Sequence, residues 1–221
     1  MNVTMDACWC PLCHAEAITK TFHRDRIRDY YCCRNCRLVF VPPNQYLSSQ
    51  NEKAQYDLHQ NSPNDRRYRQ FLNRLFLPMN EKLSPGSQGL DFGSGPGPTL
   101  SIMFQEAGHS MRIYDHFYAN DRSVFQQQYD FITATEVVEH LRHPHRELQH
   151  LWDHLKPGGL LGIMTKLAPS QDNFSVWHYK NDPTHVCFYS DVTFRWLAVQ
   201  WKSNVAFENK DVMIFRKTSG P

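Results

Sequence analysis

Two pairs of cysteines near the N-terminus have the spacing of a metal-binding module. Cys10 and Cys13 form one Cys-x₂-Cys pair, and Cys33 and Cys36 form a second pair after nineteen intervening residues. Each pair can supply two thiolates to a tetrahedral Zn²⁺ ion. Short apolar segments before and after the second pair predict the strands of a zinc ribbon. We therefore predict a structural zinc site in a ribbon over residues 1–43. The alternative is a set of reduced, buried cysteines, which would not need the paired spacing.

A second group of ligand-type residues follows the apolar segment 129–134. Glu136, Glu139 and His140 have the spacing i, i+3, i+4, which places them on one face if the segment opens a helix. Two carboxylates and an imidazole would make half of a site for Mg²⁺, Mn²⁺ or Zn²⁺, which His185 can complete. The alternative is structural, because acids favour the first turn of a helix and Thr135 is a good N-cap. Aromatic residues that flank His185 predict a partly closed wall: Trp177, Tyr179, Phe188 and Tyr189.

A glycine turn, Gly93-Ser94-Gly95-Pro96-Gly97, follows an apolar strand and precedes a helix start near residue 100. Glycines there let the backbone approach a ligand, and the helix N-terminus offers free N–H groups. No Lys-Ser/Thr pair follows, so the turn is not a phosphate-binding P-loop. Asp91 lies inside the strand, where an acid can receive the ammonium of an amino-acid-like ligand. Asp115 ends the next predicted strand, where nucleotide-binding folds place an acid on the ribose hydroxyls. An ordinary strand–helix turn and a helix cap are the structural alternatives.

From residue 84 to about 217, these motifs resemble the class I S-adenosylmethionine-dependent methyltransferases. The resemblance also rests on the Pro157-Gly158-Gly159 turn before an apolar strand, and on a C-terminal helix followed by strands 205–207 and 212–215. It implies an α/β, Rossmann-like methyltransferase sheet with a reversed last strand, and S-adenosylmethionine as cofactor. The cofactor-binding residues that it implies are Asp91, Phe92, Gly93, Ser94, Gly95, Asp115 and Thr135.

The segment between Asp115 and Tyr129 departs from that family pattern, because it is too short for the usual helix and third strand. One of the two is therefore expected to be shortened or missing, and Asp121 is a weak candidate for the acid that contacts adenine. Before the sheet, residues 44–83 read as a linker and a helix that approaches the methyltransferase domain, residues 84–221. Tyr56 or Tyr68 from this part could roof the cofactor site.

The Glu-x-x-Glu-His pattern with a later histidine is similar to two subgroups of the family. These are the ubiquinone-biosynthesis O-methyltransferases and the small-RNA 3′-terminal 2′-O-methyltransferases. The resemblance implies a divalent ion on Glu136, Glu139, His140 and His185 that holds two hydroxyls of the methyl acceptor. In the metal-free alternative, His140 or His185 acts directly as the general base. The predicted catalytic residues are thus His140, His185 and Glu136.

Composition limits the partners. The 221 residues are 41% hydrophobic, enough for one domain with a small appendage, and contain no apolar run of about 18 residues. The first six residues lack the features of a signal peptide, and seven cysteines without one indicate a cytoplasmic protein. The formal charge of +2 falls to about zero when four thiolates bind zinc, so charge does not argue for a polyanionic partner.

The sequence therefore predicts methyl transfer to a hydroxyl of a small molecule, with no membrane partner. Two alternatives stay open. One is an RNA methyltransferase that grips its substrate with the ribbon, and steep salt dependence of binding would reveal it. The other, of a different class, is a non-catalytic module that binds nucleic acid or protein on a methyltransferase scaffold.

Overall fold

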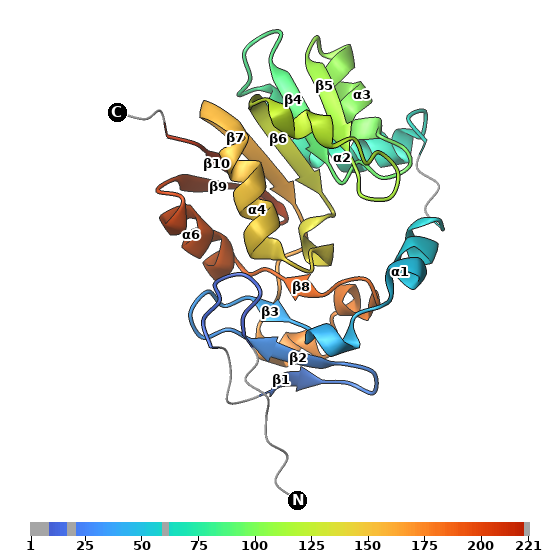
Figure 1. Ribbon diagram of the computed structural model, residues 1–221, viewed down its shortest axis with the longest axis vertical. Helices are drawn as coiled ribbons and strands as arrows, with labels where there is room; N and C mark the ends of the chain where they lie inside the picture. The colour runs from blue at the N-terminus through green and yellow to red at the C-terminus, as the bar shows by residue number, and fades with distance from the viewer. Residues whose placement is uncertain (1–8, 17–20, 59–61, 219–221) are drawn as a thin grey trace, which may run out of the picture.

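The computed structural model describes residues 9–16, 21–58 and 62–218. Residues 1–6, on which the expected lack of a signal peptide rests, lie outside these ranges. Two sheets form the architecture: a larger one that carries the methyltransferase-like topology and a smaller one below it in Figure 1. No helix in the described ranges is long and apolar enough to cross a membrane.

The larger sheet has six strands in the order β5-β4-β6-β7-β10-β9. The strands are β4 (Gln88–Phe92), β5 (Ser110–Tyr114), β6 (Tyr129–Thr135), β7 (Leu155–Met164), β9 (Asn204–Asn209) and β10 (Val212–Arg216). Strands β5, β4, β6 and β7 are parallel, whereas β10 is antiparallel to both neighbours. The predicted Rossmann-like sheet with a reversed last strand is thereby confirmed.

The shortened segment after β5 is also as predicted. Between β5 and β6 the described chain forms only the 3₁₀ helix η2 (Arg122–Gln126) and turns, so the usual third strand is missing. Strand β5 consequently lies at the edge of the sheet.

Helices cover both faces of this sheet. Helix α2 (Arg66–Asn80), N-capped by Asp65, and α3 (Thr99–Glu106) pack on one face, around Phe131 of β6. Helices α4 (Pro144–Asp153) and α6 (Asp191–Gln200) pack on the opposite face of the sheet. Ile132, the residue after Phe131 in β6, is buried on that face. This alternation along β6 is the period of two that a strand buried on both faces requires. In Figure 1, α4 crosses in front of the sheet.

The smaller sheet contains the predicted ribbon strands and one strand from far along the chain. Its order is β1 (Thr21–Arg24), β2 (Asp29–Cys32), β3 (Val39–Phe40) and β8 (Cys187–Phe188), all antiparallel. Their buried side chains belong to the same apolar cluster as α4 and α6. The ribbon is thus joined to the larger domain by both hydrogen bonds and core packing (Figure 1). The remaining elements are η1 (Pro43–Gln45), α1 (Ser49–Tyr56), η3 (Val138–His140), α5 (Gln171–Phe174) and η4 (His178–Asn181).

The four predicted cysteine ligands come together in the ribbon. Their sulfur atoms all lie within 4.8 Å of one another, with Cys10 Sγ 3.5 Å from Cys36 Sγ and Cys13 Sγ 3.4 Å from Cys33 Sγ. Four thiolates around zinc at about 2.3 Å need sulfur separations of roughly 3.8 Å. This cluster fits a small zinc-ribbon module.

We predict one zinc ion per chain on this cluster. The variant Cys33→Ser should lose zinc during dialysis against a chelator, because one of four thiolates is removed. Its neighbour Cys32 lies outside the cluster, so Cys32→Ser is the matched control and should keep its zinc. Elemental analysis of both proteins measures the difference, and a zinc-free wild type purified without chelator would contradict the assignment.

Candidate active site

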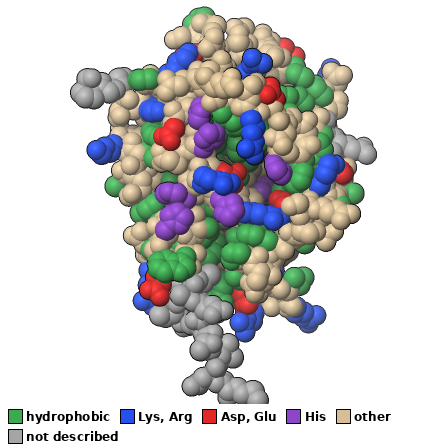
Figure 2. Space-filling model, viewed as in Figure 1, with side chains coloured by type: hydrophobic (Ala, Val, Ile, Leu, Met, Phe, Trp, Pro, Cys, Tyr) green, Lys and Arg blue, Asp and Glu red, His purple; other side chains and the backbone are tan. Residues whose placement is uncertain are grey.

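A large cavity opens at the carboxyl ends of the parallel strands. Its volume is about 1170 Å³, and its wall runs from the glycine turn to the segment that holds His185. Pockets for one small ligand usually measure about 300–1000 Å³, so this cavity has room for two ligands. Figure 2 shows the hollow surrounded by basic and histidine side chains. Those in the cavity wall include Arg122, Arg142, Arg146, His116, His143 and His150.

The glycine turn forms one end of this cavity. Gly93 and Gly95 have φ angles of +74° and +63°, which residues other than glycine rarely adopt. A Cβ atom at position 93 would lie 2.3 Å from Val137 Cγ2, so this glycine is also required for packing. A Cβ atom at position 95 would meet no atom within 4 Å. The Gly95 backbone is therefore open to a ligand.

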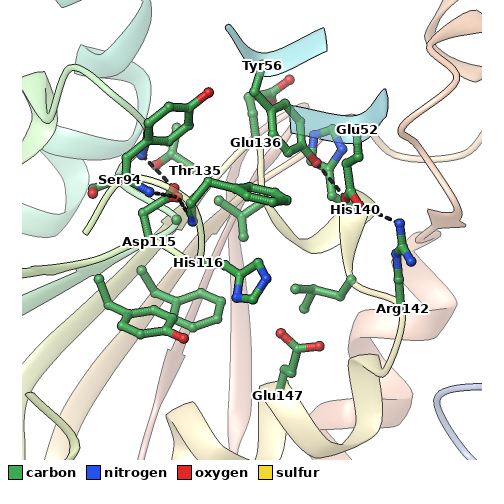
Figure 3. Close-up of a pocket in the computed structure, with 18 of the residues that line it drawn as sticks. Glu52, Tyr56, Ser94, Asp115, His116, Thr135, Glu136, His140, Arg142 and Glu147 are labelled. Atoms are coloured by element: carbon green, nitrogen blue, oxygen red, sulfur yellow. Dashed lines mark hydrogen bonds and ion pairs between the residues drawn. The ribbon is translucent and has the colours of Figure 1, made fainter. Parts of the chain in front are cut away.

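Asp115 is held in place at the same end of the cavity. One of its carboxylate oxygens accepts hydrogen bonds from the amides of Phe117 (2.8 Å) and Tyr118 (3.1 Å). The other accepts from the Gly95 amide at 2.9 Å. These bonds fix the acid next to the glycine turn, as the ribose-binding hypothesis requires (Figure 3).

Asp91 lies below the turn and is not part of the cavity wall. It is 4% exposed and accepts hydrogen bonds from Thr133 Oγ1 (2.8 Å) and Ser101 Oγ (3.1 Å). Burial raises the pKa of Asp91 to about 6, although both hydroxyls oppose the shift. Asp91 thus lies behind the cavity wall, and its contact with a ligand ammonium stays a prediction. The weak adenine candidate, Asp121, instead caps η2 through the Ser123 amide and is also outside the wall.

Two hydroxyl groups in the wall have no hydrogen-bond partner among the described residues. Ser94 Oγ and Thr135 Oγ1 are both buried and unpaired, and both residues line the cavity near Asp115 (Figure 3). A buried hydroxyl without a partner loses about 1–3 kcal/mol, so such groups usually have a ligand or water in the working protein. Thr135 is the last residue of β6, and the expectation that it caps a helix is wrong.

The segment after β6 is not the helix start that the sequence suggested. Glu136 has a left-handed φ of +52°, and residues 138–140 form only the short helix η3. The following helix, α4, begins at Pro144. A sharp turn, rather than helical spacing, places His140 in the cavity wall at the acceptor end, away from the glycine turn, with the fully buried Glu139 behind the wall.

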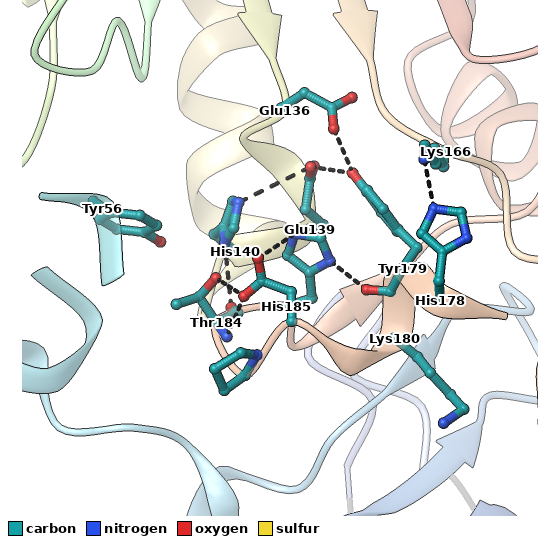
Figure 4. A network of polar contacts seen from close by, with 12 residues as sticks. Tyr56, Glu136, Glu139, His140, Lys166, His178, Tyr179, Lys180, Thr184 and His185 are labelled. Atoms are coloured by element: carbon teal, nitrogen blue, oxygen red, sulfur yellow. Dashed lines mark hydrogen bonds and ion pairs between the residues drawn. The ribbon is translucent and has the colours of Figure 1, made fainter. Parts of the chain in front are cut away.

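Glu139, His140 and His185 form a cluster at that end. One ligand-type atom from each lies within 4.8 Å of those of the other two, and Glu136 is not in this set (Figure 4). His185 Nδ1 is 2.7 Å from the Tyr179 carbonyl oxygen, and His140 Nδ1 is 3.3 Å from that of Thr184. These contacts assign the ring protons to Nδ1 and leave each Nε2 as the ligand-type nitrogen, the usual arrangement of metal-binding histidines.

Burial controls the charges in this cluster. The pKa of His185 is lowered to about 3, mainly by desolvation and secondly by the nearby His140. The His185 ring is therefore neutral at physiological pH. Burial also raises the pKa values of Glu139 and Glu136. For Glu136, repulsion by the Glu139 carboxylate raises the pKa further. Glu139 is fully buried, and its Oε2 has no hydrogen-bond partner among the described residues. Glu139 thus combines a buried, unpaired oxygen with a position beside His140 and His185, and this combination suits a cation.

Tyr179 is a residue of the site whose role the sequence did not reveal. Its hydroxyl donates to Glu139 Oε1 and lies 3.1 Å from Glu136 Oε2, so it connects the two acids. The other predicted wall residues, Trp177, Phe188 and Tyr189, pack in or against the core and do not line the cavity, which corrects that expectation. The aromatic spacing around His185 could not distinguish a wall residue from a core residue.

Helix α1 roofs the cavity between its two ends. The Tyr56 ring contacts Phe117 on the glycine-turn side (centroids 5.8 Å apart) and His140 on the acceptor side (5.3 Å). The predicted alternatives for the roof, Tyr56 and Tyr68, both line the cavity. Glu147 of α4 lies at the lower edge in Figure 3; the sequence did not reveal it, and burial raises its pKa.

The family of methyltransferase domains matches residues 58–201, which is more than half of the chain. The chain belongs to this family. No curated protein sequence matches the methyltransferase. The match agrees with the enzyme class that the sequence predicted, whereas it does not distinguish the ubiquinone-biosynthesis type from other methyltransferases.

Several solved structures resemble the methyltransferase. A 1,6-didemethyltoxoflavin-N1-methyltransferase from Burkholderia thailandensis is 14% identical over 90% of this chain and 100% of its own, with a TM-score of 0.49. An O-methyltransferase family protein from the same organism is 13% identical over 77% and 64%, with a TM-score of 0.48. The PH0226 protein from Pyrococcus horikoshii is 14% identical over 72% and 93%, with a TM-score of 0.47.

The raised pKa of Asp91 predicts a pH-dependent stability in the cofactor-free enzyme. Its folded pKa, about 6, exceeds the ordinary 3.8, so its stabilising contribution is complete below about pH 3.8 and is lost as pH rises through 6. The unfolding free energy of wild type minus that of Asp91→Asn should fall by up to about 3 kcal/mol between pH 4 and pH 7. Urea unfolding measures it. Asp121→Asn is the control: because the Ser123 hydrogen bonds lower the pKa of Asp121, the corresponding difference should not fall.

Proposed function

We propose that the protein is an S-adenosylmethionine-dependent methyltransferase that acts on a hydroxyl of a small molecule. The observation that carries the proposal is a single cavity with two chemically different ends. One end has the open glycine turn, Asp115 and two unpaired hydroxyls, and the other has His140 and His185 with the buried Glu139 behind them. In a chain of the methyltransferase family, these ends suit a nucleoside cofactor and a methyl acceptor.

The residues at the first end fit the cofactor. Asp115 is fixed beside the Gly95 backbone and can accept both ribose hydroxyls. Ser94 and Thr135 offer hydroxyl groups that lack partners in the protein, and polar groups of the amino-acid portion can satisfy them. Asp91 lies behind this end of the cavity and accepts a hydrogen bond from Ser101 Oγ in the first turn of α3. This bond ties the strand before the glycine turn to the helix after it.

The residues at the second end fit a divalent ion. A carboxylate oxygen of Glu139 and one ring nitrogen from each histidine form a mixed oxygen and nitrogen set, which suits Mn²⁺ or Zn²⁺ and, with added oxygen ligands, Mg²⁺. Glu136 lies across Tyr179 from this set and could join it through a small movement of its side chain. A bound ion would lower the pKa of an acceptor hydroxyl and fix its orientation.

The chain's own groups can then position the acceptor and move its proton. Methyl transfer is an in-line displacement in which the acceptor oxygen bonds to the methyl carbon as the carbon–sulfur bond breaks, so alignment dominates catalysis. Glu136 lines the cavity, and its raised pKa suits a group that takes a proton near neutral pH. His185 is a poor general base because its lowered pKa disfavours the protonated ring. We therefore assign the proton to Glu136 and a ligand role to His185.

Features of the ribbon favour a small acceptor over RNA. Of its basic residues, Arg28 is buried and directed at the protein's own carbonyl groups, and Arg24 pairs with Asp29. Arg28 is therefore not available to phosphates in the way that an RNA-gripping module requires, whereas Arg24 stays largely exposed beside its acidic partner. The non-catalytic scaffold is the third reading, and cofactor binding with turnover separates it from the enzyme.

Cofactor binding should depend on Gly95. The variant Gly95→Val places a branched side chain at a positive φ and directs it into open space at the glycine turn, so S-adenosylhomocysteine should bind at least about tenfold more weakly. Gly108 is the matched control, since its φ is +89° and its Cβ position is also empty, but it does not line the cavity. Calorimetry should show normal affinity in Gly108→Val. Equal affinity in wild type and Gly95→Val would remove this cofactor site.

The acceptor end should require both histidines and an ion. His140→Ala and His185→Ala should each lower turnover by about 10²-fold or more, while S-adenosylhomocysteine binding stays within about twofold of wild type. Excess chelator should act likewise and reversibly, with ribbon zinc content monitored in parallel. His178→Ala is the control, because His178 lines the cavity outside the cluster. Full activity with zinc in the ribbon but no second ion would favour the metal-free mechanism.

A further inference from the structure

The ribbon places one buried arginine against the segment that carries His185. Arg28 follows the turn between β1 and β2 and is 7% exposed. Its guanidinium donates to four carbonyl oxygens: those of Lys180, Asp182 (3.0 Å), Pro183 (3.3 Å) and His185 (2.9 Å). The described residues provide it with no carboxylate partner. A buried charge is therefore stabilised by backbone dipoles from a single loop.

This geometry uses properties that are specific to arginine. The planar guanidinium carries five N–H donors in a fixed fork, so one side chain can bind several carbonyl groups that point toward a common centre. Four carbonyl groups from residues 180–185 converge in this way only if the loop keeps one conformation. Removing the guanidinium would leave converging, partly buried carbonyl oxygens without donors, at a cost that favours a different loop conformation.

The ribbon reaches the acceptor cluster by a second route. The Val41 amide, just after β3, donates to the Val186 carbonyl oxygen at 2.9 Å. The Val186 amide donates in turn to the Glu139 carbonyl oxygen at 2.8 Å. The two routes meet at adjacent residues, since Arg28 binds the carbonyl oxygen of His185.

We infer that the zinc ribbon is the positioning scaffold of the acceptor site, with Arg28 as the positioning residue for His185. The ribbon fixes the positions of His185 and Glu139 relative to each other. The acceptor end therefore depends on a module outside the methyltransferase sheet. The inference rests on the proposed function in that these residues belong to the active site. Arg28 itself does not line the cavity and has no direct contact with a ligand.

The test compares Arg28→Lys with Arg26→Lys in the full-length, zinc-loaded protein. Arg26 is on the same turn and is exposed, so its conservative change is the matched control. Hydrogen exchange is followed in residues 180–188, where the amides of Thr184, His185 and Val186 are hydrogen-bonded, and in the glycine turn. Arg28→Lys should exchange about tenfold faster in residues 180–188 and normally in the glycine turn, because a lysine cannot bind four carbonyl groups. Amide exchange rates in residues 180–188 of Arg28→Lys that equal those of the wild type would overturn the inference.

A binding measurement links this loop to the proposed chemistry. In Arg28→Lys, Mn²⁺ should bind the acceptor end about tenfold more weakly, while S-adenosylhomocysteine affinity and ribbon zinc stay normal. If wild-type protein binds no second ion, the proposed metal site fails, yet the exchange experiment still decides the role of Arg28. If exchange in residues 180–188 is unchanged in Arg28→Lys, the inference fails, whether or not Mn²⁺ binding is weakened.

Zinc removal from the wild type provides a second test that needs no substitution. Loss of the ion should loosen the ribbon and raise exchange in residues 180–188, with the glycine turn protected as before. This measurement decides the question if Arg28→Lys does not fold. Exchange in residues 180–188 that is unaffected by zinc removal would show that the ribbon does not hold the loop.

Discussion

The fully buried carboxylate of Glu139 is the constraint on which the acceptor half of the structure depends. A carboxylate without water is costly unless hydrogen bonds or a cation stabilise its charge. Here Tyr179 donates to one oxygen, Oε1, and the other, Oε2, has no hydrogen-bond partner among the described residues. The left-handed residue at 136 and the short helix η3 place the carboxylate there. The protein bears this cost beside His140 and His185, where we proposed that a cation binds.

Much of the fold could be predicted because the deciding signals are local. The cysteine spacing, the glycine turn and the apolar strands each depend on neighbouring residues, and the structure confirms the cysteine cluster and the reversed last strand. Chain length alone predicted that the usual helix or the third strand would be shortened or missing, since too few residues separate Asp115 from Tyr129, but it did not show which. These features require no knowledge of what packs against them.

The site was harder to predict because its geometry comes from tertiary contacts. Helical periodicity suggested a shared face for Glu136, Glu139 and His140, but a positive φ at Glu136 breaks that periodicity. No sequence pattern marks a non-glycine residue for that conformation, which surrounding packing must impose. Arg28 was likewise one of several arginines between the cysteine pairs, and its role follows from a loop about 150 residues later.

The ribbon and the acceptor loop each supply what the other lacks. A ribbon of about 40 residues has little core of its own, and a strand of two residues such as β8 cannot persist without a partner. Pairing of β3 with β8 places both in one sheet, and Arg28 adds a charged contact at the other end of the loop. If the four cysteines bind zinc as predicted, the free energy of metal binding also stabilises the conformation of the loop, because the loop packs on the folded ribbon. Under the proposed function, zinc bound by the ribbon would therefore help to determine how well the acceptor end is formed.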